Sequence, residues 1–166
     1  MKNLYLAMLL TLSSLIGCEE RDDCQPDSVT TTFTHGKKIK KEFYAANNLN
    51  YYTVEEGGNT VFEHVFSRAQ CDNRIDDELA RIFSFEINTE ATQFRFVGDD
   101  VNLTNCFFNE VGGWARGMYE IEGGLIEGTK TPEGNWRVKV SVQTIPNPIR
   151  TGEQPEKIEF DEVFTK

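Results

Sequence analysis

Carboxylates and histidines are the residues of this chain whose types could support chemistry. Acidic pairs occur at Glu55-Glu56 and Asp99-Asp100, beside glycines typical of turns. Glycoside hydrolysis needs two carboxylates roughly 5–10 Å apart in a cleft, a geometry that adjacency in sequence does not establish. His64 shares strand parity with Phe62 and Phe66, which indicates a core or sheet-face histidine rather than a member of a nucleophilic triad. We therefore expect no catalytic residues, and the sequence predicts that the protein is not an enzyme.

Metal and cofactor chemistry has little support in the sequence. One segment gathers oxygen ligands of the kind that calcium prefers, although their spacing does not match the helix-flanked calcium loop. These calcium candidates are Asp72, Asn73, Asp76 and Asp77. The chain has no Cys-x-x-Cys pair, and its two histidines stand apart, which argues against zinc. We therefore predict no cofactor and no established metal site.

The chain has four cysteines, and each has a predicted role. Cys71 and Cys106 both lie in the region expected to fold, so we predict that they form a disulfide and leave Cys24 free. The alternative pairs Cys24 with either of the other two, which would pin the start of the mature chain to the domain. Cys18 belongs to a different motif.

The first eighteen residues have the pattern of an export signal. Lys2 precedes an apolar run from Leu4 to Ile16, which is shorter than the roughly 20 residues of a membrane span. The segment Leu15-Ile16-Gly17-Cys18 resembles the lipobox of bacterial lipoproteins. That resemblance implies cleavage before Cys18, a diacylglycerol on its thiol and an acyl chain such as palmitate on the new amino terminus. It therefore implies a bacterial outer membrane lipoprotein, anchored through lipid on Cys18.

The residues after Cys18 read as a charged tether. Glu19-Glu20-Arg21-Asp22-Asp23 loosely resembles the acidic signal that sends some Bacteroidota lipoproteins to the cell surface, so both a surface and a periplasm-facing location stay open. Asp27-Ser28-Val29 resembles the O-glycosylation triplet of that phylum, which makes Ser28 a candidate for modification. We predict a signal peptide over 1–17, a lipidated acidic tether over 18–28 and one domain over 29–166.

Strand periodicity dominates the rest of the chain. Trp136, Val138, Val140 and Val142 alternate with polar residues, which predicts a strand with one buried face. Gly123-Gly124 is a two-residue hairpin signal, so the sequence predicts a three-stranded meander over 114–145. Further strands are expected at 29–34, 37–44, 49–54, 60–66, 81–87 and 93–96, with a helical turn at 76–80.

Many short strands joined by turns predict an all-β fold, either a single antiparallel β-sandwich or a meandering β-barrel. Twelve phenylalanines would supply much of its core. Ile158 and Phe160 begin a last strand, and Phe164 continues their parity. A bulge at Asp161-Glu162 would keep Glu162 out of the core. The Pro-containing segment 145–156 is expected to be a long loop. The last strands resemble those of small uncharacterised β-rich lipoproteins of Bacteroidota, a resemblance that implies no activity.

The formal net charge of −10 argues against nucleic acid as a partner, because phosphate binding needs clustered Lys and Arg. Two functions remain: a non-enzymatic binding or accessory module for a glycan, a small molecule or a protein, and a structural or inhibitory lipoprotein that binds a basic protein. A carbohydrate-active hydrolase is a distant third. Tyr51, Tyr52 and Trp114 are the candidate glycan or ligand contacts, and only one of the two tyrosines can face the core.

Overall fold

A computed structural model describes residues 24–46, 49–71, 78–112, 117–147 and 151–166. The all-β prediction is confirmed, because these ranges contain strands and one short 3-10 helix, η2. The elements are β1 (Cys24–Gln25), β2 (Ser28–Tyr44), β3 (Leu49–Ser67), β4 (Gln70–Cys71), β5 (Ala80–Asn88), β6 (Gln93–Val97), η2 (Gly98–Thr104), β7 (Phe107–Val111), β8 (Gly117–Lys130), β9 (Trp136–Thr144) and β10 (Lys157–Phe164). No helix in these ranges has the length and apolar composition to cross a bilayer.

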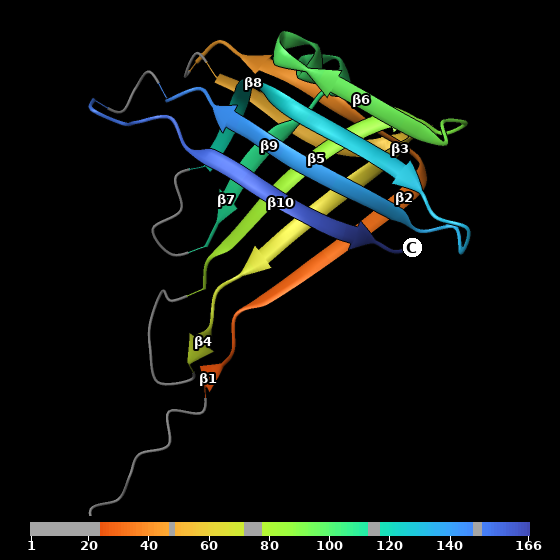
Figure 1. Cartoon of the computed structure of the whole chain (residues 1–166). Helices are drawn as coiled ribbons and strands as arrows, with labels where there is room; N and C mark the ends of the chain where they lie inside the picture. The colour runs from red at the N-terminus through yellow and green to blue at the C-terminus, as the bar shows by residue number, and fades with distance from the viewer. Residues whose placement is uncertain (1–23, 47–48, 72–77, 113–116, 148–150) are drawn as a thin grey trace, which may run out of the picture.

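The strands form one curled antiparallel sheet, a half-barrel with the order β10-β9-β8-β7-β5-β3-β2 (Figure 1). β6 adds to the far half of β8, and β1 pairs with β4 in a separate two-stranded ribbon. The edge strands β2 and β10 converge at one end, where Thr32 and Thr165 form an isolated parallel bridge. The sheet is therefore joined at one end and splayed at the other.

The inner face of the curl holds the main core. In β9 the predicted alternation is confirmed, since Trp136, Val138, Val140 and Val142 are all buried. Phe62 of β3 lies at the centre, fully buried, and its ring contacts five other aromatic rings. Those rings belong to Phe33, Phe85, Phe94, Trp136 and Phe164. Stacking of large rings leaves the inside of the half-barrel filled by side chains.

The hairpin predicted at Gly123-Gly124 is wrong. β8 runs unbroken through both glycines, with a register shift between Ile121 and Gly123 where it pairs with β9. A Cβ on Gly124 would lie 2.3 Å from the Ser141 carbonyl oxygen, and its φ is +137°. The glycines therefore permit a bulge and a close approach of neighbouring backbones, and the three-stranded meander reduces to β8 and β9.

The long β2–β3 hairpin bends near its middle. Four of the expected short strands merge in it, and its register shifts between His35 and Lys38 beside Gly36, whose φ is +72°. Beyond the bend, the distal half runs back over the outer face of the sheet (Figure 1). There, a second cluster forms from Ile39, Tyr52, Val61 and Phe107, with Met118 packed against it. The fold thus gains a partial second layer.

A buried carboxylate fastens this second layer. Glu86 of β5 points to the outer face and is only 6% exposed. Its Oε2 accepts a hydrogen bond from the Ile39 backbone N–H at 2.5 Å, and its Oε1 accepts one from the Asn105 amide at 2.7 Å. The folded-back hairpin and the turn after η2 are therefore tied to the same side chain, because a buried carboxylate is costly without such donors.

The predicted disulfide between Cys71 and Cys106 is wrong. Cys71 is bonded to Cys24, because the pairing of β1 with β4 places these two residues directly opposite one another. Cys106 is a free, buried thiol that donates to the Val101 carbonyl at 3.4 Å. The fold therefore adopts the alternative in which Cys24 pairs with one of the other two cysteines.

Two smaller expectations also change. The bulge at Asp161-Glu162 is wrong, because β10 pairs with β9 in unbroken register from Lys157 to Phe164. Glu162 keeps the inward parity and remains exposed, since the sheet edges have begun to separate there. Of the predicted helical turn at 76–80, residues 76–77 lie outside the described residues, and 78–80 are not helical, since Ala80 begins β5. The helix η2 was not predicted.

Candidate functional site

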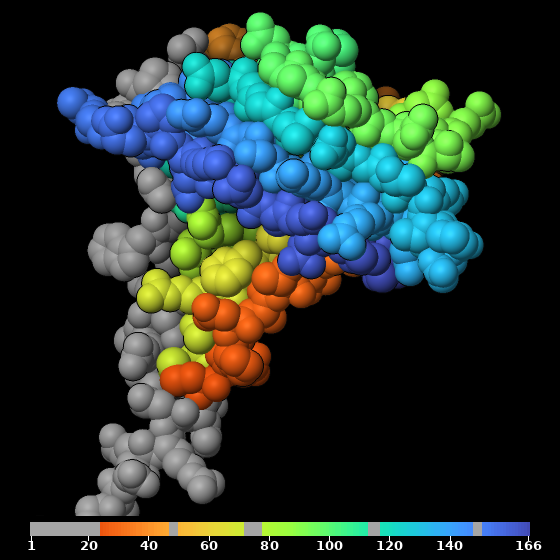
Figure 2. Space-filling model, in the orientation of Figure 1, coloured from red at the N-terminus to blue at the C-terminus, as the bar shows by residue number. Residues whose placement is uncertain are grey.

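The strongest candidate site lies between β10 and the inner faces of β3, β5 and β7, where the half-barrel is splayed. We call it the aromatic slot; its volume is about 220 Å³. Its walls are formed by His64, Phe66, Phe83, Phe108, Ile158 and Phe160. Figure 2 shows atoms of β3 and β5 uncovered between β10 and the start of β2. The predicted sheet-face position of His64 is confirmed, and its parity with Phe66 brings both side chains into the slot.

The rings that form the walls of the slot are neutral, and the charged residues Arg81, Lys157 and Glu159 complete its lining. The His64 ring stacks on Phe160 with ring centroids 4.1 Å apart. Burial lowers the pKa of His64, and the nearby charge of Glu162 offsets only part of that effect. The imidazole is therefore neutral at pH 7, and the walls offer an apolar, aromatic surface.

A cluster of charges closes the inner end of the slot. The guanidinium of Arg81 lies 5.0 Å from the centre of the Phe108 ring and pairs with both Glu110 and Glu156. Glu110 is buried, and its carboxylate lies 3.4 Å from Arg81 Nε. Because one arginine holds both carboxylates, the arrangement is a structural ion cluster rather than a pair of acids facing a substrate.

The backbone of β2 beside the slot directs some of its N–H and C=O groups away from β3. At the closed end, the Phe33 N–H donates to the Thr165 carbonyl at 2.9 Å, and the Thr165 N–H donates to Thr31 at 3.2 Å. Odd-numbered residues of β2 therefore direct their N–H and C=O groups away from β3. By this alternation Val29, which is 52% exposed, presents its N–H and C=O at an edge that no described strand covers.

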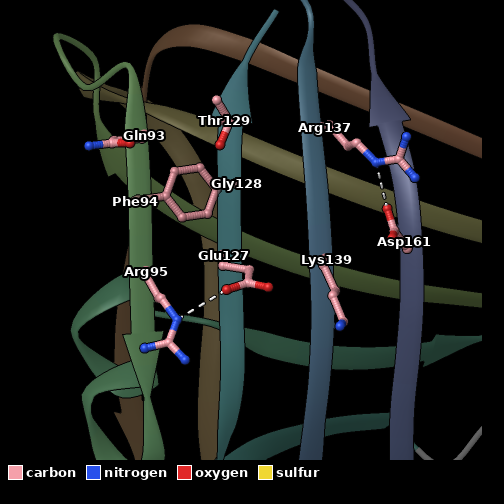
Figure 3. Close-up of a pocket in the computed structure, with 9 residues that line it drawn as sticks. All are labelled: Gln93, Phe94, Arg95, Glu127, Gly128, Thr129, Arg137, Lys139 and Asp161. Atoms are coloured by element: carbon pink, nitrogen blue, oxygen red, sulfur yellow. Dashed lines mark hydrogen bonds and ion pairs between the residues drawn. The ribbon is translucent and has the colours of Figure 1, made fainter.

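A larger hollow of about 650 Å³ lies on the outer face of β6, β8, β9 and β10 (Figure 3). Strand register aligns Arg95, Glu127, Lys139 and Asp161 in a row of alternating charge. Arg95 pairs with Glu127 at 3.1 Å, and Arg137 pairs with Asp161 at 3.0 Å. Because both arginines already have carboxylate partners in water, we assign this surface to solubility and cross-strand pairing.

The residues predicted from sequence are scattered. Tyr52 is buried and stacked on Phe107, while Tyr51 is exposed against Tyr44, so the expectation that only one tyrosine faces the core is confirmed. Ser28 is an exposed residue at the start of β2. Trp114, Cys18 and the four calcium candidates Asp72, Asn73, Asp76 and Asp77 lie outside the described residues. Where the structure is described, no three His, Cys, Asp or Glu side chains gather as metal ligands.

Sequence reasoning missed the slot itself. Its signal was present in the shared parity of His64 and Phe66, but the facing wall comes from Ile158 and Phe160, far along the chain. Comparisons with protein families, curated proteins and solved structures find no match.

The titration of His64 leads to a testable prediction. Its folded pKa lies below the unfolded value of 6.5, so the unfolded state takes up a proton first as the pH falls. Stability should be fully present above pH 6.5 and decline as the pH falls below it, by up to about 1.4 kcal/mol for each unit of pKa difference. Urea midpoints at pH 7.5 and 5.5 should show this decline in the wild type and a flatter profile in His64→Gln.

His35→Gln is measured in parallel. Burial and the charges of Lys166 and Lys130 also lower the pKa of His35, so this residue contributes separately to the same decline in stability. The carboxyl groups whose pKa is lowered, such as that of Glu120, reduce stability mainly as the pH falls below their ordinary pKa of 4.5. They therefore contribute little to the difference between pH 7.5 and 5.5. An unchanged slope in His64→Gln would contradict the assignment of a buried, neutral imidazole.

Proposed function

We propose that this protein is a lipid-anchored, extracytoplasmic binding module that captures an extended segment of a partner protein at the aromatic slot. The observation that carries the proposal is the coincidence of an apolar slot with the uncovered backbone edge at Val29. Proteins bind extended peptides by adding a strand to such an edge, and neighbouring pockets select the side chains.

The size of the slot narrows the partner. A slot of about 220 Å³ with aromatic walls suits one aromatic side chain of the kind that anchors protein interfaces. Glu159 lines the slot, where Lys157 pairs with it at 3.0 Å, and Glu162 is exposed on the inward-facing row of β10. The chain as a whole carries a net charge of −10. We therefore propose that the partner segment has one aromatic residue flanked by Lys or Arg. Such a partner is consistent both with a binding module and with a lipoprotein that binds a basic protein.

Anchoring rests on separate observations. The Leu15-Ile16-Gly17-Cys18 segment supports lipidation of Cys18. The Cys24–Cys71 disulfide supports an oxidising, exported environment, since such bonds are rare in the cytosol. Anchoring and segment capture together describe an accessory protein that holds a partner close to a membrane surface, and the proposed role is non-enzymatic.

The test replaces one edge residue, Val29, with proline. The soluble domain would be panned against a phage-displayed library of random decapeptides, and the enriched peptides would be synthesised. Val29→Pro removes an N–H that points away from β3, so the β2–β3 ladder should survive. We expect the variant to bind enriched peptides at least tenfold more weakly, measured by fluorescence anisotropy.

Val29→Thr is the matched control, because it keeps the N–H and the β-branched side chain. It should bind as the wild type does, and both variants should keep the wild-type urea midpoint to within about 1 kcal/mol. A library that yields no aromatic-containing peptides, or a Val29→Pro variant that binds normally, would refute capture at this edge.

A further inference from the structure

A second cavity lies beside the distal half of the β2–β3 hairpin and shares no lining residue with the aromatic slot. We call it the hairpin pocket; its volume is about 250 Å³. Lys41 and Tyr52 line it from the hairpin, Asn102 and Asn105 from η2 and the turn after it, and Glu120 from β8. Four separate segments therefore bring polar groups to one small space.

Glu120 is the central group of the hairpin pocket. Its Oε1 accepts hydrogen bonds from the Lys41 ammonium, from the Asn50 amide at 2.8 Å and from the Tyr52 hydroxyl at 3.1 Å. Every hydrogen bond and ion pair between Glu120 and a described side chain uses Oε1, which leaves Oε2 as an acceptor. Burial alone would raise the pKa of Glu120, but the hydrogen bonds and charge of Lys41 and the bonds from Tyr52 and Asn50 outweigh burial and lower it.

The other polar groups complement that acceptor. Asn105 uses its amide N–H₂ on Glu86, so its side-chain oxygen remains to accept, and the exposed Asn102 carries both a donor and an acceptor. The ammonium of Lys41 can donate more than one hydrogen bond. Buried Ile121 and Cys106, with the exposed Ile145, supply the apolar part of the lining.

We propose that the hairpin pocket binds a neutral, polyhydroxylated ligand, namely a single sugar residue. Hydroxyl groups both donate and accept, which matches a wall that offers carboxylate and amide oxygens beside ammonium and amide N–H groups. The charge of Glu120 is balanced by Lys41, so the pocket gives a charged ligand no complementary net charge. Of the two predicted glycan contacts that the structure describes, Tyr51 and Tyr52, it is Tyr52 that lines this cavity, and its hydroxyl donates a hydrogen bond to Glu120.

This site is separate from the aromatic slot, and its test does not depend on the slot. The probes are D-glucose, D-galactose, D-mannose and N-acetylglucosamine, titrated into the ¹⁵N-labelled protein with its Cys24–Cys71 disulfide intact and followed by two-dimensional NMR. At least one sugar should give saturable shifts of the Asn102, Asn105 and Ile145 amides with millimolar affinity. The methyl glycoside forms a second arm: if it binds as well, the pocket admits the end of a glycan chain, and if it does not, the ligand is the free monosaccharide.

Glu120→Gln is the decisive variant, because it keeps one oxygen for the hairpin donors and replaces the free acceptor with an N–H₂ group. It should weaken sugar binding at least tenfold. Glu127→Gln, an acid-to-amide change in the charged row on the outer face of β8, should bind as the wild type does. Should Glu120→Gln fold poorly, Asn102→Ala tests the same wall at an exposed position and should also weaken binding. No saturable shift with any probe, or wild-type binding by both variants, would overturn the proposal.

Discussion

Replacing Cys18 with Ala is expected to move the protein from the membrane fraction to the soluble fraction. On the proposed anchoring, the resemblance of Leu15-Ile16-Gly17-Cys18 to a lipobox would make the Cys18 thiol the attachment point of the lipid. Two or more acyl chains hold a protein firmly, whereas a single chain gives only marginal binding. The remaining chain is strongly acidic and would not be attracted to anionic lipid, so nothing else in the proposed anchor would retain it.

Fractionation after a high-salt wash is the measurement, and mass spectrometry of the mature amino terminus checks the modification. Gly17→Ala is the matched control, because small residues are accepted before the lipobox cysteine, and it should remain in the membrane. A Cys18→Ala variant that still sediments with membranes in high salt would contradict the anchor.

Replacing Cys71 with Ser is expected to lower the free energy of unfolding by about 4 kcal/mol. The bond closes a loop with a sequence separation of 47 residues, and cross-linking a loop of this size restricts the unfolded chain by roughly that amount on the chain-entropy model. Urea unfolding without reductant should show the loss, and wild-type protein in reductant should unfold at the midpoint of the variant.

Two variants control this interpretation. Cys24→Ser should lose the same stability, and the double variant should lose no more, because both changes remove one bond. Cys106→Ser should leave the effect of reductant intact, since Cys106 is a free thiol. A loss below about 1 kcal/mol in Cys71→Ser would mean that the ribbon of β1 and β4 frays without affecting the domain.

The disulfide also changes the expected reach of the anchor. A tether over 18–28 would extend roughly 30 Å, but the chain is joined to the domain at Cys24, which leaves roughly 20 Å from Cys18 when fully extended. If Cys18 carries lipid, the domain lies close to the membrane. A partner segment captured at the aromatic slot would then be held near that surface.

Local patterns in the chain were enough to predict the fold class and much of the core. Alternation in β9 placed Trp136 and three valines on the inner face, because side chains alternate across a strand whatever the strand pairs with. The same reasoning placed His64 on a sheet face and showed that Tyr51 and Tyr52 point to opposite sides. The export signal is likewise a local pattern, and it remains a prediction.

Features that depend on distant partners were decided only by the tertiary structure. Gly123-Gly124 carries the signature of a turn, but the backbones that pack against it make it a bulge within β8. Cys71 could bond to either remaining cysteine, and the pairing of β1 with β4 chose Cys24. The aromatic slot and the hairpin pocket each join segments far apart in the chain, because the sheet curls and the hairpin folds back over it. Periodicity reports the face on which a side chain lies, whereas the residue that it meets there depends on strand order and curvature.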